Sequence, residues 1–231
     1  MEPPTVPKPT QEPCALPGLY LITPQPGADD ARFLQELHAS LAAHAPGSLL
    51  VQFRAHGLEP EHWLALAGEV LRRCRAHDAR LVLGAGGLPR ATPAQFMRSL
   101  RDLGADGLHL PSRMLREPAW REACGDDSAR PLLAASCHDA GQLQAARALG
   151  ATLATVSPVL PTASHPGAAG LGWERLRELC VQACLPVYAL GGLDVRHASS
   201  ARAAGAAGIA AIRGLWLGNA QAAHGPRTGS G

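Results

Sequence analysis

The chain has 231 residues, of which 46% are hydrophobic and 17% are charged, and this composition excludes wholesale disorder. No apolar run approaches the ~20 residues of a membrane span, and the N-terminus lacks the basic and apolar regions of a secretory signal. A formal net charge of +2 is too small to indicate a nucleic-acid partner. Six cysteines without CxxC spacing fit a reducing compartment, so we expect a cytoplasmic protein with no membrane or nucleic-acid partner.

The two ends of the chain differ in composition from the part between them. Residues 1–17 are rich in proline and lack apolar periodicity, which predicts a disordered tail or linker. Residues 218–231 predict a disordered C-terminal tail, which leaves residues 18–217 as the folded domain. The only lysine, Lys8, lies in the first tail, and this excludes Schiff-base chemistry in the folded domain.

Short apolar runs recur along the folded domain, each four to six residues long and bounded by Gly, Pro or polar residues. They occupy residues 18–23, 48–53, 80–83, 106–110, 131–136, 151–156, 186–190 and 207–212. Runs of this kind are typical of strands buried on both faces of a parallel sheet.

Between the runs, apolar residues recur with helical spacing, as at Phe33, Leu37 and Leu41 and again over residues 173–181. Eight strands and at least seven helices in alternation predict an α/β fold, the (β/α)₈ TIM barrel. The alternative is a doubly wound sheet. That fold would need a GxGxxG-type turn after the first strand, where residues 23–27 read TPQPG.

In such a barrel, function lies at the carboxyl ends of the strands. Residues Gln52 and Arg54 end one predicted strand on the same side, and Ser136 and His138 end another in the same way. The turn Gly191–Gly192 and the nearby Arg213 follow the last two strands. Glycine N–H groups beside an arginine predict a phosphate site there.

Acidic residues are missing from these strand ends, so paired carboxylates and an oxygen-rich magnesium site are not expected. Histidine is then the candidate for proton transfer, and four histidines lie near strand ends: His56, His109, His138 and His165. His138 is the strongest candidate, because it directly follows a strand on the side of Ser136.

Seven blocks in order resemble the thiamin-phosphate synthase/TenI superfamily over about residues 18–216. They are YLIT (20–23), VQFR (51–54), GADGLHL (104–110), AASCH (134–138), SPVLPTASHPG (157–167), VYALGGL (187–193) and GIAAIRGLW (208–216). The PTASHPGA and IAAIRGLW stretches most resemble the synthase-like domains that follow a MutT-type Nudix hydrolase in some bacterial proteins. The resemblance implies a TIM barrel of thiamin biosynthesis.

The resemblance also implies roles for individual residues. A diphosphate would be held by Gln52, Arg54 and Ser136, and Thr162 and Ser164 match two family hydroxyl positions. The thiazole-phosphate site would comprise Gly191, Gly192, Ile212 and Arg213. His138 matches the catalytic histidine of the TenI tautomerases. The family's Asn-Asp pair is replaced by Gly84–Ala85, and its Gly-Gln-x-Asp segment by residues 111–114, so no magnesium cofactor is expected.

These observations leave two function classes open. The first is an enzyme acting on thiazole phosphate, with pyrimidine diphosphate as a further ligand: either a divergent thiamin-phosphate synthase (a transferase) or a thiazole tautomerase (an isomerase). The second is a non-catalytic ligand-binding or regulatory domain associated with a Nudix hydrolase as partner. The Nudix signature itself does not occur in these 231 residues.

Overall fold

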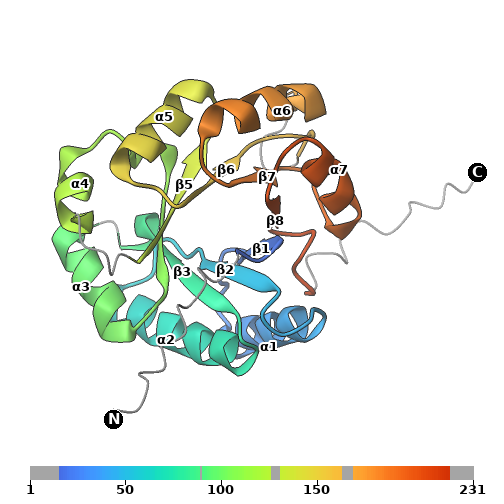
Figure 1. Cartoon of the computed structure of the whole chain (residues 1–231). Coiled ribbons are helices and arrows are strands. Elements are labelled where there is room, and N and C mark those ends of the chain that lie inside the picture. Colours follow the sequence, from blue (N-terminus) through green and yellow to red (C-terminus); the bar gives the residue numbers. More distant parts are fainter. Residues whose placement is uncertain (1–15, 89, 126–130, 163–168, 219–231) are drawn as a thin grey trace, which may run out of the picture.

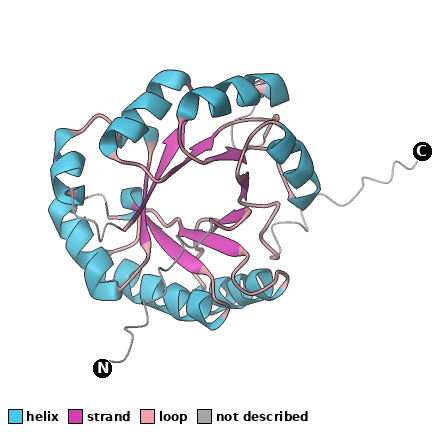
Figure 2. Cartoon of the chain, viewed as in Figure 1, coloured by secondary structure: helices cyan, strands magenta, loops and turns pink. Residues whose placement is uncertain are grey.

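The computed structural model describes residues 16–88, 90–125, 131–162 and 169–218 of the chain. Within these residues, eight strands alternate with seven α-helices, and the helices form a ring around the strands (Figures 1 and 2). The strands are β1 (Leu19–Ile22), β2 (Leu49–Phe53), β3 (Arg80–Gly84), β4 (Gly107–Leu110), β5 (Leu132–Cys137), β6 (Leu153–Val156), β7 (Val187–Leu190) and β8 (Gly208–Ala211). The helices are α1 (Asp30–Ala42), α2 (Pro60–Ala76), α3 (Pro93–Leu103), α4 (Pro118–Cys124), α5 (Ala140–Leu149), α6 (Gly172–Ala183) and α7 (Ala198–Ala203).

The sheet is a closed barrel in which each strand is parallel to the next. Closure comes from β1, which pairs with β2 on one side and with β8 on the other, where Leu19 lies opposite Ile209. The predicted (β/α)₈ barrel is therefore confirmed and the doubly wound alternative is wrong, because an open sheet has two edge strands whereas every strand here is paired on both sides. Each observed strand begins and ends within two residues of its predicted range.

Side chains alternate along each strand between the barrel lumen and the layer under the helices. In β2, for example, Leu50 belongs to the cluster that fills the lumen, whereas Leu49, Val51 and Phe53 belong to the outer core. Both faces of the strands are buried, which is why each strand appears in the sequence as a continuous apolar run.

The outer core contains a row of six aromatic rings, here called the aromatic row. Neighbouring rings in it have centroids 5.2–6.4 Å apart, and the row runs under α1 to α4. Its members, in spatial order, are Trp216, Phe33, Phe53, Trp63, Phe96 and Trp120. Because Trp216 follows β8 while Phe33 lies on α1, the row also joins the end of the folded domain to its beginning.

The helix-to-strand turns lie at the end of the barrel opposite the functional one. Gly104 and Gly150 end α3 and α5 with φ of 73° and 90°, a left-handed conformation that glycine adopts at low cost. Next to the first of these turns, the Asp106 carboxylate accepts a hydrogen bond from Leu81 N at 2.7 Å. Asp106 therefore stabilises this end and does not face the functional one.

Two expectations about helices need correction. Val181 was grouped with the apolar face of α6, but its side chain is 78% exposed, because it lies about 200° around the helix from the buried Leu179. The spacing of Cys180 and Cys184, one helical turn apart, favours two core residues, but Cys180 is half-buried and Cys184 ends α6 as an exposed residue. The predicted tails lie largely outside the described residues. Among the described residues, none of the helices combines the length and the hydrophobicity that a membrane span requires.

Candidate functional site

The carboxyl ends of the eight parallel strands meet at one rim of the barrel, here called the mouth. Of the predicted site residues, those at or near this rim are Gln52, Arg54, Ser136, His138, Thr162, Gly191, Gly192, Ile212 and Arg213. Four of the loops that carry them follow β2, β5, β7 and β8. The site is thus assembled from segments that are far apart in the sequence.

At the end of β2, Thr23 fixes the backbone that carries two candidate residues. Thr23 Oγ1 accepts a hydrogen bond from Arg54 N at 2.9 Å, and Thr23 N donates to Gln52 O at 3.0 Å. The Gln52 side chain is 7% exposed, and its amide nitrogen lies 3.3 Å from the point where a Cβ on Gly84 of β3 would be. The guanidinium of Arg54, which is half-buried, has no hydrogen-bond partner among the described residues.

A chain of three side chains crosses the lumen below the mouth, and we call it the lumen chain. The Tyr20 hydroxyl lies 2.7 Å from His109 Nδ1, and His109 Nε2 lies 2.7 Å from Ser136 Oγ. Tyr20 is also packed edge-on against Tyr188, whose hydroxyl donates to the carbonyl of Pro17. Burial raises the pKa of Tyr20 well above its ordinary value and that of Tyr188 to about 12, so both phenols are neutral.

The buried imidazole of His109 predicts a pH dependence of stability. Burial lowers the pKa of His109 from 6.5 to about 4. Between these two values the unfolded chain binds more protons than the folded one, so the free energy of unfolding falls as the pH falls. We expect this residue to account for a loss of about 3 kcal/mol on going from pH 7 to pH 4.

Urea unfolding of the wild type and of a His109→Gln variant at pH 7 and at pH 4.5 measures this dependence. The wild type should lose more of its free energy of unfolding on acidification than the variant does. Equal losses in the two proteins would contradict the assignment of this pH dependence to His109.

His138 follows β5 at the mouth and is exposed. Its Nδ1 lies 2.8 Å from the carbonyl oxygen of Ser157, to which it donates a hydrogen bond, so the neutral ring carries its proton on Nδ1. The other nitrogen, Nε2, then has a free lone pair and no partner among the described residues. A histidine held in this way can accept a proton at Nε2.

The loops after β7 and β8 lie against each other. Gly191 and Gly192 have φ of 107° and 67°, and a Cβ on Gly192 would lie 2.6 Å from Pro161 O, so only glycine fits there. After β8, Trp216 N donates to Ile212 O at 3.1 Å and closes one helical turn. Among the described residues, no acceptor is found for the N–H groups of Gly191, Gly192, Arg213 and Gly214.

The segment Ser157–Pro161, which follows β6, joins His138 to the glycine turn. Ser157 O accepts the hydrogen bond from His138, and Leu160 N donates to Gly191 O at 3.1 Å. The imidazole and the free N–H groups are thus fixed to the same short segment.

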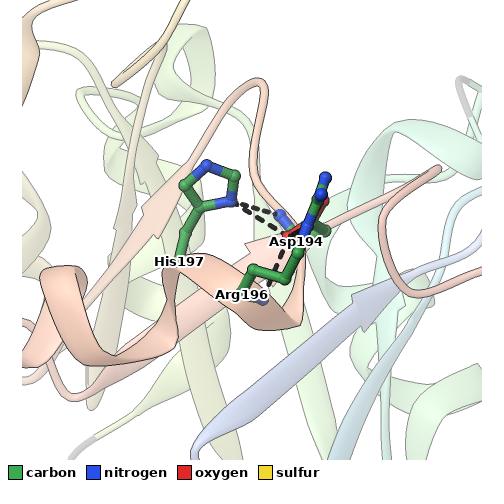
Figure 3. Close-up of polar contacts among 3 residues, drawn as sticks. All are labelled: Asp194, Arg196 and His197. Atoms are coloured by element: carbon green, nitrogen blue, oxygen red, sulfur yellow. Dashed lines mark hydrogen bonds and ion pairs between the residues drawn. The ribbon is translucent and has the colours of Figure 1, made fainter.

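The helical segment after the glycine turn is capped by a carboxylate that the sequence analysis did not single out. Asp194 Oδ1 accepts from Arg196 N at 3.0 Å, and Arg196 and His197 both contact this carboxylate (Figure 3). The hydrogen bonds from Arg196 lower the pKa of Asp194 to about 2. Because Asp194 already occupies this helix N-terminus, an anion would have to bind to the glycine turn and to the turn after β8.

A family model described as thiamine monophosphate synthase matches residues 19–215, which is most of the chain. A thiamine-phosphate synthase of Chromobacterium violaceum is 32% identical over 200 residues, and the match covers 86% of this chain and 88% of the relative. The chain belongs to the thiamine monophosphate synthase family.

Some relatives are longer than this chain. The bifunctional protein ThiM/ThiE of Symbiobacterium thermophilum is 35% identical over 167 residues, which is 72% of this chain but 32% of the relative. The chain therefore spans about a third of that fused protein. The thiamine phosphate pyrophosphorylase of Pyrococcus furiosus has the same fold, with a TM-score of 0.61, 20% identity and 84% of each chain covered.

The magnesium site that this family implies does not fit the residues present. At the mouth near β3 and β4, a Cβ on Gly86 would lie 3.2 Å from His56 Cε1 and 3.3 Å from an Arg113 guanidinium nitrogen. The Arg113 guanidinium offers no oxygen ligand to a hard cation, and neither Gly84–Ala85 nor residues 111–114 contain a carboxylate. Among the described residues, no three His, Cys, Asp or Glu side chains come together as a metal site.

Most of the predicted site residues lie within the part of the chain that the structure describes. Ser164 and His165 lie outside the described residues, and Thr162 is half-buried in the loop after β6. Tyr20 was not predicted as a site residue, because its run, YLIT, indicates only a buried strand. Asp139 and Asp194 were not predicted either; they follow β5 and β7 by a few residues and cap the next helical segments.

A groove of about 440 Å³ lies between the loops that follow β2 and β3 and the helices α2 and α3. Its lining includes Leu58, Leu64, Leu88 and Arg90, and none of the predicted site residues. The candidate site therefore lies apart from this groove.

Proposed function

We propose that this barrel binds thiazole phosphate at the mouth and acts on it as a proton-transfer isomerase of thiamin biosynthesis. The observation that carries the proposal is the segment Ser157–Pro161, which contacts both His138 and the glycine turn. A phosphate group held at the turn would position the attached ring for the imidazole.

The phosphate would bind to the free N–H groups of the glycine turn and of the turn after β8, with Arg213 as the counter-charge. The neighbouring carboxylate of Asp194 would repel an anion if it were unpaired. Its ion pair with Arg196, with N···O at 2.7 Å, offsets that repulsion.

Proton transfer would then use His138 alone. Its Nε2 lone pair removes a proton from one atom of the ring system, a double bond shifts, and the imidazolium returns the proton to another atom. The hydrogen bond to Ser157 O stabilises the imidazolium while the proton is held. Atoms and electrons balance within the substrate, so no oxidant or co-reactant is needed.

The magnesium-dependent synthase reaction is less well supported, although Gln52, Arg54 and Ser136 remain at the mouth as candidate ligands of a diphosphate. A leaving diphosphate needs charge stabilisation of several kcal/mol, which a metal ion usually supplies. Arg54 alone would supply a few kcal/mol. A Nudix domain as partner also stays a proposal, which rests on the sequence resemblance of the PTASHPGA and IAAIRGLW stretches alone.

Two assays of the full chain test the proposed function. We expect tautomer conversion of thiazole phosphate that is unaffected by a chelator, and little or no thiamin phosphate formation with or without magnesium. Robust magnesium-dependent synthesis would overturn the proposal. Binding of thiazole phosphate with neither reaction would show instead that the barrel is a non-catalytic binding domain.

Removing Arg213 should weaken the binding of thiazole phosphate. A hydrogen bond to a charged group contributes about 1.5–3 kcal/mol, so Arg213→Ala should raise the dissociation constant about 10- to 100-fold. Calorimetry with and without magnesium measures this effect. Arg98→Ala, which removes an exposed arginine from α3, is the matched control and should bind as the wild type does. Unchanged affinity in Arg213→Ala would contradict the assignment.

A further inference from the structure

We propose that Tyr20 and His109 act as positioning residues that hold the Ser136 hydroxyl as a hydrogen-bond donor toward the mouth. Ser136 would then favour an acceptor, such as a phosphate oxygen, and disfavour a ligand N–H group at the same place. The second statement rests on the proposed role of Gln52, Arg54 and Ser136 as ligands of a diphosphate. The first follows from the lumen chain alone.

The protonation of His109 determines the direction of the hydrogen bonds in the lumen chain. The side chain is 3% exposed and both ring nitrogens have partners at 2.7 Å. A neutral imidazole carries one proton, so one nitrogen donates and the other accepts. Two arrangements of the lumen chain are therefore available.

In the first arrangement, the Tyr20 hydroxyl donates to Nδ1 and the proton on Nε2 is donated to Ser136 Oγ. Every buried polar atom of the lumen chain is then satisfied. The hydroxyl proton of Ser136 remains unused, and Ser136 is the one member of the chain that is only half-buried. Its proton can therefore reach a ligand or solvent at the mouth.

In the second arrangement, Ser136 donates to Nε2 and Nδ1–H donates to the Tyr20 oxygen. The Tyr20 hydroxyl proton then has no acceptor, because His109 is its only hydrogen-bond partner among the described residues. Tyr20 is completely buried, and a buried donor without a partner carries the full cost of desolvation. The first arrangement is therefore the stable one.

The neighbours of the lumen chain do not change this result. Tyr188 packs edge-on against Tyr20 at a centroid distance of 5.6 Å, but its hydroxyl donates to Pro17 O. Thr155 lies opposite Ser136 in the register of β5 and β6, and its buried Oγ1 has no partner among the described residues. The direction of the lumen chain is thus set at Tyr20 and transmitted through His109.

The first experiment determines the tautomer of His109 in the full chain without any ligand. Two-bond ¹H–¹⁵N correlation spectra identify which ring nitrogen carries the proton. We expect the Nε2–H tautomer in the wild type and in Tyr188→Phe, and a change or a mixture in Tyr20→Phe. An Nδ1–H tautomer in the wild type would overturn the inference, whatever the protein binds.

The second experiment measures the affinity for inorganic diphosphate, a probe whose oxygens are mostly hydrogen-bond acceptors. Ser136→Ala should weaken binding about 10- to 100-fold and Tyr20→Phe about 3- to 10-fold. The double variant should bind no more weakly than Ser136→Ala alone, because both changes remove the same donated hydrogen bond. Tyr188→Phe is the matched control, since it removes a buried phenol hydroxyl that is not part of the lumen chain, and it should bind as the wild type does.

Full additivity of Tyr20→Phe and Ser136→Ala, or an equal loss in Tyr188→Phe, would show a merely structural effect and overturn the inference. If the wild type binds no diphosphate while His109 is protonated on Nε2, the assignment of the donor stands and Ser136 is not a diphosphate ligand. The two failures are therefore distinguishable.

Discussion

Replacing His138 by asparagine is expected to slow proton transfer on thiazole phosphate by ~10²–10⁴-fold, the usual contribution of a general acid–base. An asparagine amide can still donate to the carbonyl of Ser157, the acceptor that now lies 2.8 Å from His138 Nδ1. It has no equivalent of the free Nε2 lone pair. The affinity for thiazole phosphate should therefore change little while the turnover number falls.

His56→Asn is the matched control for this experiment. His56 is another histidine at the mouth whose Nδ1 contacts a loop carbonyl, that of Gly86 at 3.1 Å. It faces the side of β3 and not the segment Ser157–Pro161, so its replacement should leave the turnover number nearly unchanged. Steady-state kinetics measures the turnover numbers of the wild type and the two variants, and calorimetry measures their affinities for thiazole phosphate. A His138→Asn variant that keeps its turnover number would show that another group moves the proton.

The largest effect on stability is expected from Trp63→Ala. Trp63 is fully buried in the aromatic row, with ring contacts to Phe53 at 5.4 Å and Phe96 at 6.0 Å. Truncating a buried tryptophan to alanine leaves a cavity and typically costs 3–5 kcal/mol, or roughly 6–20 °C in Tm for a domain of this size.

Trp173→Ala is the control, because Trp173 lies half-buried on α6, where it stacks on His197 outside the aromatic row. Calorimetric unfolding should show a clearly smaller loss of Tm in this variant. Similar losses in the two variants would mean that the aromatic row does not dominate the stability of the barrel.

The sequence predicted the barrel well because its strands are buried on both faces and so appear as short apolar runs. Helices were harder to predict where few of their residues are buried. Helix α7 has six residues, of which Ala201 alone is buried, so it gives no usable periodicity. The exposed Val181 was misplaced for a related reason, because an apolar residue need not face the core.

Within the site, residues at strand ends could be predicted because the topology fixes where strand ends lie. Ser136, His138 and Gly191 fall in this group. The lumen chain could not be predicted from the sequence, because it joins β1 to β4. These two strands are not neighbours, and their side chains meet only across the interior of a closed barrel. Asp194 was overlooked because it acts on the helical segment after the strand and not on the strand end itself.

Closure of the sheet by β1 and β8 has a consequence for folding kinetics. The contact between Leu19 and Ile209 joins the first strand to the last, and contacts of such high sequence separation are intrinsically slow to form. During synthesis, β1 emerges long before its second partner, and a chain that ends before β8 leaves the outer edges of β1 and β7 without a neighbour. Unpaired parallel edges of this kind are templates for association with other strands. The barrel is therefore most exposed to misassembly in the interval before Gly208–Ala211 takes its place.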